Sequence, residues 1–367
     1  MKSEKNANAK KKVLVGMSGG VDSSVAAALL MEAGYDVTGG FMKNYSDTLD
    51  VWTGECEWKR ERRDALRVAA KLGIPLLTFD FEKAYREKVF ERMFREYESG
   101  ITPNPDVLCN EEIKFGLFYD KAMAMDFDYI ATGHYARIEK NIDGEFQLLK
   151  GKDTNKDQSY FLHRIAKATL PHVLFPIGKY TKKDVRRMAN ERELMTANKP
   201  DSQGICFVGD MDFKELLRKK IVAKPGKVVT PEGKVIGTHD GLDSVTIGQR
   251  HGFHITSGEH AWYAASKDRV QNRLIVVPSR DSELLFSEKV VVKDVHWMNQ
   301  PLKTSGMMNV AVRYRAKEVP AIIEKISKKE LVLGFLEPVW GLAPGQSAVF
   351  YNGEVCLGGG FISDPSL

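Results

Sequence analysis

Two residues in the loop 99–110 (SGITPNPDVLCN) have side chains that can do chemistry together. Asp106 and Cys109 lie three residues apart, just before a segment that favours a helix. The positive end of a helix dipole favours the thiolate of a nearby cysteine, and a carboxylate beside the sulfur can take or give a proton. If the helix begins at Leu108–Asn110, Asp106 caps it. The loop alone is equally compatible with a capping aspartate next to an incidental buried cysteine.

A second stretch, VLVGMSGGVDSS at 13–24, has the residues of an anion-binding loop. Val13–Met17 is an apolar run of strand length, Ser18–Gly20 forms a turn, and the residues after it favour a helix that ends at Gly34. Backbone N–H groups at a helix N-terminus attract anions, and glycines let the backbone approach a phosphate closely. The pattern G-x-x-x-x-G-K-[ST] is absent, which excludes an ordinary kinase-like phosphate loop. A plain glycine turn before a capped helix is the alternative for a loose Gly-Gly pair, but the complete string is far more specific.

The four cysteines, Cys56, Cys109, Cys206 and Cys356, form no C-x-x-C pair. Their number and scatter argue against a disulfide scaffold and a zinc finger, and they point to a reducing cytosol. Cys206 lies in the glycine-containing stretch Ser202–Phe207, which by itself is a weak signal because free cysteines are often simply buried. We interpret Cys56 and Cys356 as structural, since Cys356 alternates with apolar residues in a predicted strand and Cys56 starts a charged helix.

Alternating strands and helices in the first half of the chain predict the frame that positions these residues. Such alternation implies right-handed crossovers and a mostly parallel sheet covered on both faces, the α/β class. Ligands of such sheets bind beyond the carboxyl ends of the strands. Met17, Met42 and Gly133 lie at such ends, so we expect them around one nucleotide. The predicted strands are 13–17, 36–42, 74–79 and 129–132, and the predicted helices are 55–72, 82–97 and 113–125.

The pattern loosens after Lys150 and becomes rich in β-structure from Gly226 onward. In the segment 308–315 apolar and polar residues alternate, which places Arg313 and Arg315 on one strand face. Phosphate contact there is reasonable, and a solvated strand face is the alternative. Asn-Gly at 352–353 predicts a hairpin. The predicted helices of this part are Ser159–Lys167, Thr181–Glu193 with Thr181 as its N-cap, and Met211–Lys220.

The composition of the 367 residues narrows the class of protein. A net charge of +5 and an isoelectric point near 8.8 permit a nucleic-acid partner without establishing one. No apolar run is long enough to span a membrane, and the lysine-rich start of the chain lacks an apolar signal core. We therefore expect a cytoplasmic protein with a disordered basic tail at 1–12, and we expect a monomer.

The string at 16–24 resembles the PP-loop of N-type ATP pyrophosphatases, which cleave ATP to AMP and pyrophosphate by adenylating a substrate. Six further strings, in order along nearly the whole chain, make the sequence similar to the bacterial-type tRNA-specific 2-thiouridylases, which replace O2 of the wobble uridine with sulfur. One such string would be weak, whereas seven in order are specific. The strings are Gly16–Ser24, Asn104–Asp106 with Cys109, Ala131–Tyr135, Lys156–Leu162, Ser202–Phe207, Thr246–Gly252 and Arg313–Arg315.

The resemblance implies an architecture and a set of residue roles. The fold would be a parallel-sheet, adenine-nucleotide α-hydrolase-like (PP-loop) domain at 13–210, a small, mainly β central domain at 211–280 and a C-terminal β-barrel at 281–367. In this family Cys109 is the nucleophile, Cys206 carries sulfur as a persulfide, and Asp106 is the general acid/base. The residues implied to bind ATP are Gly16, Met17, Ser18, Gly19, Gly20, Val21, Asp22, Ser23, Ser24, Met42 and Gly133. Those implied to contact tRNA are Asn104, Pro105, Asp106, His134, Lys156, Asp157, Gln158, Arg313, Tyr314 and Gln346.

The resemblance also implies cofactors and partners. We expect ATP with Mg²⁺, although no residue marks a metal site, and we expect no zinc. An iron–sulfur cluster is not expected, because such clusters usually need several closely spaced cysteines and this chain offers two together with Asp106. The expected partners are a tRNA with a wobble uridine, of the lysine, glutamate or glutamine type, and a persulfide donor such as a cysteine desulfurase or a sulfur-relay protein.

Two other functions stay open at this point. A different PP-loop enzyme could adenylate another tRNA base or an amide-forming acceptor, and it would need no pair of reactive thiols. A tRNA-binding or sulfur-carrier protein with a relic PP-loop would bind tRNA without ATP-dependent release of pyrophosphate. At the level of single residues, His134 could equally be a structural histidine at a strand end, and Gln346 a turn residue.

Overall fold

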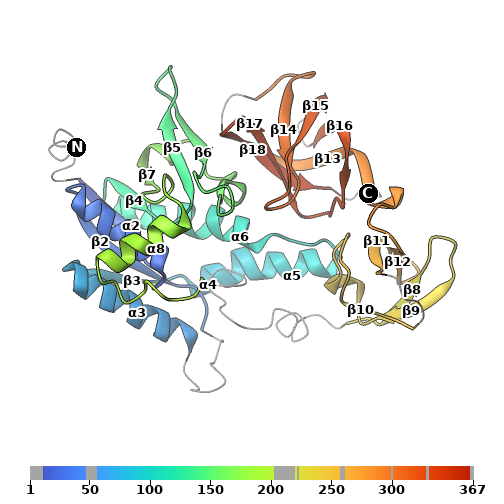
Figure 1. Cartoon of the computed structure of the whole chain (residues 1–367), viewed down its shortest axis with the longest axis horizontal. Coiled ribbons are helices and arrows are strands. Elements are labelled where there is room, and N and C mark those ends of the chain that lie inside the picture. The colour runs from blue at the N-terminus through green and yellow to red at the C-terminus, as the bar shows by residue number, and fades with distance from the viewer. Residues whose placement is uncertain are drawn as a thin grey trace. The chain divides into compact units, whose positions relative to one another are not determined.

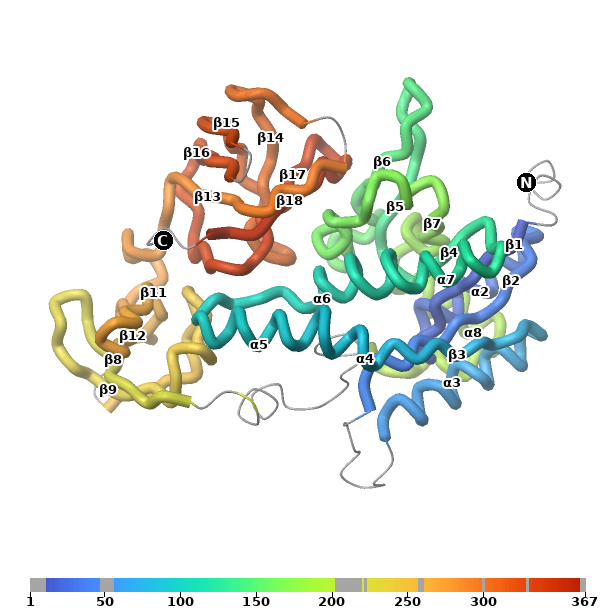
Figure 2. Tube along the Cα trace, turned by 180° about the vertical axis from the view of Figure 1, so that it is seen from behind, coloured from blue at the N-terminus to red at the C-terminus, as the bar shows by residue number. Residues whose placement is uncertain are grey.

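The computed structural model describes residues 11–46, 56–201, 220, 223–256, 261–298, 301–327 and 330–363. The chain divides into two compact units, which are shown in Figure 1 and, from behind, in Figure 2. Unit 1 comprises the described residues within Met1–Phe90, Pro105–Met211 and Glu354–Leu357. Unit 2 comprises those within Glu91–Asn104, Asp212–Gly353 and Gly358–Leu367.

Unit 1 is built on a five-stranded sheet in the order β3-β2-β1-β4-β7, and all four of its strand pairings are parallel. The central strand β1 is apolar and buried, as expected of a parallel strand covered on both faces. The predicted α/β class is confirmed. The strands of this sheet are β1 (Lys12–Gly16), β2 (Asp36–Lys43), β3 (Leu76–Asp80), β4 (Tyr129–Ala131) and β7 (Val173–Leu174). Unit 1 also contains an antiparallel hairpin outside this sheet, formed by β5 (Ala136–Lys140) and β6 (Phe146–Lys150).

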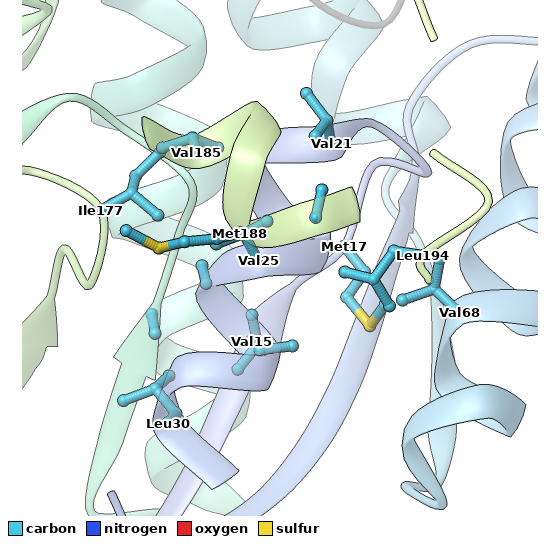
Figure 3. Close-up of a cluster of buried hydrophobic side chains, with 14 of the residues drawn as sticks. Val15, Met17, Val21, Val25, Leu30, Val68, Ile177, Val185, Met188 and Leu194 are labelled. Carbon is cyan, nitrogen blue, oxygen red and sulfur yellow. The ribbon is translucent and has the colours of Figure 1, made fainter. Parts of the chain in front are cut away.

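Three helices share one hydrophobic cluster with β1, as Figure 3 shows. Val15 of β1, Val25 of α2, Val68 of α3 and Met188 of α8 all contribute to it. Helix α2 is buried nearly all round, so it depends on its neighbours rather than on an amphipathic face. The helices of unit 1 include α2 (Val21–Glu32), α3 (Glu57–Leu72), α7 (Phe118–Ala124), α8 (Lys182–Glu191) and the short 3-10 turns η3 (Ser159–Leu162) and η4 (Leu170–His172).

Helix α8 begins as predicted, with Thr181 at its N-cap. The Thr181 side chain accepts a hydrogen bond from the Asp184 backbone N–H, and the Asp184 carboxylate accepts one from the Thr181 N–H. This reciprocal capping box fixes the start of the helix. The predicted helix Ser159–Lys167 is wrong beyond Leu162, because only the 3-10 turn η3 forms. The predicted helix Met211–Lys220 lies outside the described residues except for Lys220.

The predicted helix 82–97 forms as a continuous helical run that contains a π-helical segment. It consists of α4 (Glu82–Tyr85), η1 (Arg86–Phe90) and α5 (Glu91–Glu98). The helix after the loop starts earlier than predicted, at Pro105, and runs through α6 (Pro105–Leu108) and the π-helical η2 (Cys109–Leu117) into α7. Proline is favoured at a first helical position because its missing N–H costs nothing there. The condition under which Asp106 would cap the helix, a helix start at Leu108–Asn110, is therefore not met.

Unit 2 contains a small sheet and a closed barrel. The small sheet has the order β10-β9-β8-β12-β11. The barrel has the order β13-β16-β15-β14-β17-β18, and pairing of β13 with β18 closes it, which confirms the predicted β architecture. The bounds are β8 (Gly226–Val229), β9 (Val235–His239), β10 (Phe253–Ile255), β11 (Tyr263–Asp268), β12 (Arg273–Val277), β13 (Phe286–Trp297), β14 (Met307–Ala311), β15 (Val319–Ile326), β16 (Glu330–Trp340), β17 (Ser347–Asn352) and β18 (Val355–Ile362), with 3-10 turns η5 (Leu242–Ser244) and η6 (Glu283–Leu285).

One strand of the barrel is shorter than its sequence pattern predicts. Strand β14 ends at Ala311, and the residues that follow form a bend and a turn in which Arg315 has a positive φ of 61°. Arg313 and Arg315 therefore do not share a strand face, and that prediction is wrong. Within the described residues, no helix is long and apolar enough to cross a membrane.

Candidate functional site

The loop between β1 and α2 has the geometry of an anion-binding turn. Gly19 has a φ of 73°, and a Cβ there would lie 2.4 Å from the backbone oxygen of Glu61, so only glycine fits. The N-cap of α2 is Gly20, which has no side chain to cap the helix. The first-turn N–H groups are thus left for an anion. The Ser23 and Ser24 hydroxyls both donate to the Gly20 carbonyl, at 3.2 and 2.7 Å, and hold the turn together.

The carboxyl ends of the parallel strands meet at this loop. A Cβ on Gly133, just after β4, would lie 2.6 Å from the Ser23 backbone nitrogen, so the strand end packs directly on the start of α2. A Cβ on Gly16 would lie 3.2 Å from Cε of Met42, which belongs to β2. The structure therefore brings together the residues expected around one nucleotide, and their part in binding ATP stays a prediction.

Asp22, in the first turn of α2, is the centre of an ionic network. Lys182 Nζ lies 2.8 Å from both carboxylate oxygens of Asp22 and 2.7 Å from Oδ1 of Asp201. The Tyr135 hydroxyl donates to Asp22 at 2.8 Å. Lys156 Nζ contacts the other oxygen of Asp201 at 2.6 Å. Lys182 is only 13% exposed, so its charge is held in place mainly by these two carboxylates.

The protonation of this network follows from its contacts. Burial alone would raise the pKa of Asp201, but hydrogen bonds from Lys156 and Lys182 outweigh it and lower the pKa to about 2. Burial raises the pKa of Tyr135, and the neighbouring Asp22 carboxylate raises it further. Asp201 is therefore ionised and Tyr135 neutral at pH 7, which fits the donor role of the tyrosine hydroxyl.

A second cation, Lys199, connects the glycine turn to helix α3. Lys199 Nζ donates to the carbonyl of Gly19 at 3.1 Å and pairs with Asp64 of α3 at 2.8 Å. Glu61 of α3 lies beside Gly19, and burial raises its pKa to about 7, with a smaller contribution from Glu57. The glycine turn is thus fixed from both flanks by side chains distant in sequence.

Asp106 and Cys109 are one helical turn apart in the helix that begins at Pro105. Residues three apart in a helix are neighbours on its surface. Cys109 is fully buried, while Asp106 is partly exposed. Proton exchange between this carboxylate and this thiol stays a prediction.

The second predicted cysteine, Cys206, lies outside the described residues, so its position relative to Cys109 stays a prediction. Cys356 is buried in β18 opposite Leu148 of β6. Cys56 is partly exposed at the start of α3. The burial of Cys356 fits its structural interpretation, and the structural interpretation of Cys56 stays a prediction.

Four predicted tRNA contacts in unit 1 make intramolecular hydrogen bonds. His134 is buried between Thr132, 2.7 Å from its Nδ1, and Lys114, and burial with that lysine holds the pKa of the ring well below its usual range. This favours the structural alternative for the histidine. The Asp157 carboxylate accepts a hydrogen bond from the backbone N–H of Gly151 at 2.8 Å. The Gln158 side-chain oxygen accepts one from the backbone N–H of Tyr135, and Lys156 donates one to Asp201.

The predicted contacts in unit 2 are also engaged. Arg313 donates to the backbone carbonyls of Ile247 and Gly341, and its guanidinium lies over the Trp340 ring, 5.4 Å from the centroid. Gln346 Nε2 donates to the carbonyls of Thr102 and Pro103, at 3.0 and 3.2 Å. Contact of these side chains with tRNA stays a prediction, as it does for Tyr314.

Sequence reasoning missed the cations of the network, Lys182 and Lys199, and their partners Asp201 and Asp64. Lys182 carries one available signal, since a lysine at the first position of a helix opposes the helix dipole and suggests an acidic partner. Lys199 carries none, because its partners come from α3 and the glycine turn. In the part of the chain that the structure describes, no three His, Cys, Asp or Glu side chains are grouped as metal ligands.

Comparison with known proteins gives consistent matches. Family models match as the tRNA methyl transferase HUP domain at residues 11–210, the tRNA methyl transferase PRC-barrel domain at 214–278 and the aminomethyltransferase beta-barrel domain at 287–362. The chain is 46% identical to tRNA-specific 2-thiouridylase MnmA of Geobacillus thermodenitrificans, over 96% of this chain and 95% of that protein. It is 47% identical to the Vibrio cholerae protein of that name, over 99% of both chains, and 46% identical to that of Bacillus subtilis, over 96% and 95%. The chain therefore belongs to the tRNA-specific 2-thiouridylase family.

Proposed function

We propose that this protein is an ATP-dependent tRNA-uridine 2-sulfurtransferase that forms 2-thiouridine at the wobble position of tRNA. The observation that carries the proposal is the identity of 46–47% to proteins with this printed name over nearly the full length of both chains. The glycine turn between β1 and α2 supports it, because that turn offers backbone N–H groups to an anion at the edge of a parallel sheet.

The proposed reaction begins with activation of the base. O2 of the uridine attacks the α-phosphorus of ATP, an O–P bond forms, and pyrophosphate leaves. The loop Gly16–Ser24 holds the phosphates, and Met42 and Gly133 border the nucleotide. Mg²⁺ would offset the charge of the phosphates, and the described residues include no set of three ligands for it. Adenylation turns O2, a poor leaving group, into one that departs as AMP.

Sulfur transfer follows on two cysteines. The terminal sulfur of a persulfide on Cys206 adds to C2, directly or after release as sulfide, and the C2–O bond breaks to release AMP. Attack of the Cys109 thiolate on the inner sulfur of Cys206 breaks the S–S bond and leaves a Cys109–Cys206 disulfide, which an external thiol must reduce before the next cycle. Asp106, one turn from Cys109, takes and returns the proton.

Further parts of the proposal concern partners and organisation. The substrate is a tRNA with a wobble uridine, and Asn104, Pro105, Lys156, Arg313 and Gln346 are among its contacts. The persulfide comes from a separate sulfur donor, and the protein acts as a cytoplasmic monomer. The division at 13–210, 211–280 and 281–367 is supported by similar limits in the three matching family models.

Nucleoside mass spectrometry tests the proposal directly. Unmodified lysine tRNA is incubated with Mg·ATP, a persulfide donor and either the wild-type protein or a Cys109→Ser, Cys206→Ser or Cys56→Ser variant. We expect 2-thiouridine from the wild type and from Cys56→Ser, the matched thiol control, and none from the other two. Pyrophosphate release without 2-thiouridine from the wild type would instead identify an adenylating enzyme with another acceptor.

A further inference from the structure

Unit 2 contains a cavity of about 410 Å³ that the reaction described above does not use. This size lies within the range of about 300–1,000 Å³ that is typical of ligand pockets. Much of its wall is aliphatic, with Ile247, Leu285, Val290 and Ile362 among the lining residues. Among the described residues that line it there is no carboxylate, whereas three cations do so: Lys267, Arg269 and Lys289.

The walls of the cavity are fixed by hydrogen bonds. Arg313 holds the carbonyl of the lining residue Ile247, and Gln346 holds the carbonyl of the lining residue Thr102. The hydroxyls of Thr102 and Thr246 lie 3.3 Å apart and join the same two wall segments. Because these contacts connect four distant stretches of the chain, the walls of the cavity are held in place by the fold itself.

Two of the three cations are held near the segment that leads to Asn104. Lys267 Nζ donates to the carbonyl of Gly100 at 3.1 Å. A Cβ on Gly100, which has a φ of 64°, would lie 2.0 Å from the Arg269 guanidinium, so the glycine makes room for this cation. Asp243 interacts electrostatically with both cations and lines a neighbouring pocket together with Glu98 and Arg269, but neither carboxylate lines this cavity. Lys289 differs, since it is paired with Glu324 at 2.8 Å.

We propose that this cavity takes one unpaired nucleotide of the tRNA other than the wobble uridine, with the base against the aliphatic wall and a phosphate at Lys267 and Arg269. Proteins hold splayed, single-stranded RNA nucleotides by stacking the base on aromatic side chains or on an arginine guanidinium and by placing cations at the backbone. This cavity offers the Arg269 guanidinium, the Lys267 ammonium group and aliphatic side chains. The lining residue Thr102 precedes Asp106 by four residues in the sequence. The inference rests on the proposed tRNA substrate.

Two variants probe the two halves of the nucleotide. Ser266→Trp fills the cavity from an exposed position in β11, where an aromatic side chain is well tolerated. Arg269→Gln removes the phosphate contact. Lys234→Gln, at an exposed position between β8 and β9, is the matched charge control. The probe is unmodified lysine tRNA, with binding measured by fluorescence anisotropy at several salt concentrations and folding checked by circular dichroism.

We expect Ser266→Trp to weaken tRNA binding about tenfold, the effect of losing one base contact. Arg269→Gln should reduce the slope of log affinity against log salt by about 0.7, the value for one single-strand phosphate contact, and Lys234→Gln should leave it unchanged. An abasic substitution at one unpaired anticodon-loop position should weaken binding to the wild type and not to Ser266→Trp.

Equal losses from every abasic substitution in the wild type and in Ser266→Trp would overturn the inference. So would unchanged tRNA affinity in Ser266→Trp. Formation of 2-thiouridine by the wild type is measured in parallel, so failure of the cavity proposal is distinguishable from failure of the proposed reaction. If the wild type forms 2-thiouridine and Ser266→Trp binds normally, only the cavity proposal is lost.

Discussion

The glycine turn of unit 1 and the loops of unit 2 that carry Arg313 and Gln346 were both singled out by sequence motifs, but they differ in what the motif reports. Gly19 and Gly133 act through their missing side chains, and a Cβ at either would collide with backbone atoms. Arg313 and Gln346 act through long polar side chains, and each is bonded to backbone carbonyls of its own unit. A glycine motif thus indicates where the backbone must pass close to other atoms. A motif of long polar residues does not indicate which hydrogen-bond partners these side chains will have, because the partners depend on the fold.

The largest effect is expected from Gly133→Ala, which tests whether the glycine turn needs a residue without a side chain at this position. The new Cβ would lie 2.6 Å from the Ser23 nitrogen and 2.7 Å from the Asp22 carbonyl carbon. Such overpacking costs about 1–3 kcal/mol and displaces the start of α2, so ATP affinity should fall tenfold or more by calorimetric titration. Gly144→Asn is the control, since nothing lies within 4 Å of a Cβ there and asparagine tolerates a positive φ. Unchanged ATP affinity in Gly133→Ala would separate the turn from nucleotide binding.

A smaller loss is expected from Lys182→Met, which tests whether side chains also set the geometry of the glycine turn. The change leaves Asp22 and Asp201 without the cation they share. We expect the free energy of unfolding to fall by about 1–2 kcal/mol, less than for a fully buried pair because both carboxylates are partly exposed, and the KM for ATP to rise. Lys183→Met, its exposed neighbour, is the matched control. Equal denaturation midpoints for the two variants would contradict the role of Lys182.

The variant Gln346→Leu tests whether a long polar side chain of unit 2 stabilises the free protein. It removes two hydrogen bonds to the carbonyls of Thr102 and Pro103, so the free energy of unfolding without tRNA should fall by about 1–2 kcal/mol. Urea denaturation of the free protein measures it, with Gln271→Leu, at an exposed position, as the control. If Gln346→Leu leaves the stability of the free protein unchanged and weakens only tRNA binding, the glutamine is a contact and not an internal brace.

The effect expected from Glu61→Gln, beside the glycine turn, depends on pH and becomes the smallest of the four at pH 4. The folded-state pKa of about 7 lies above the unfolded value of about 4.3, so the folded protein binds more protons in that interval. The stability of the wild type therefore falls as pH rises from about 4 to 7 and then levels off. Glu61→Gln should stabilise the protein by about 1–2 kcal/mol at pH 8 and little at pH 4. Thermal unfolding of both proteins at the two pH values measures the difference, and equal shifts at both would contradict the burial of this carboxylate.

The sequence predicted features that depend on neighbouring residues. The alternation of strands and helices gave the parallel sheet, Thr181 gave the start of α8, and the string at 16–24 gave the glycine turn. These features have signals that are local in the sequence: the alternation of apolar segments, a capping residue and a glycine-containing string. The start of the helix that carries Asp106 and Cys109 was misplaced because Pro105 at a first helical position competes with the more obvious stop signal of a proline-containing loop.

By itself, the sequence determined the fold class, the glycine turn between β1 and α2 and the family, because these follow from local patterns and from motifs in order. Only the tertiary structure decided that Lys182 joins Asp22 to Asp201, that Lys199 braces Gly19, and that Arg313 holds the wall of a cavity. The physical reason is that a long polar side chain can reach many partners. Which of them it meets depends on segments that are distant in the sequence, such as Gly19 and Lys199, which are 180 residues apart, or Thr102 and Gln346, which are 244 residues apart.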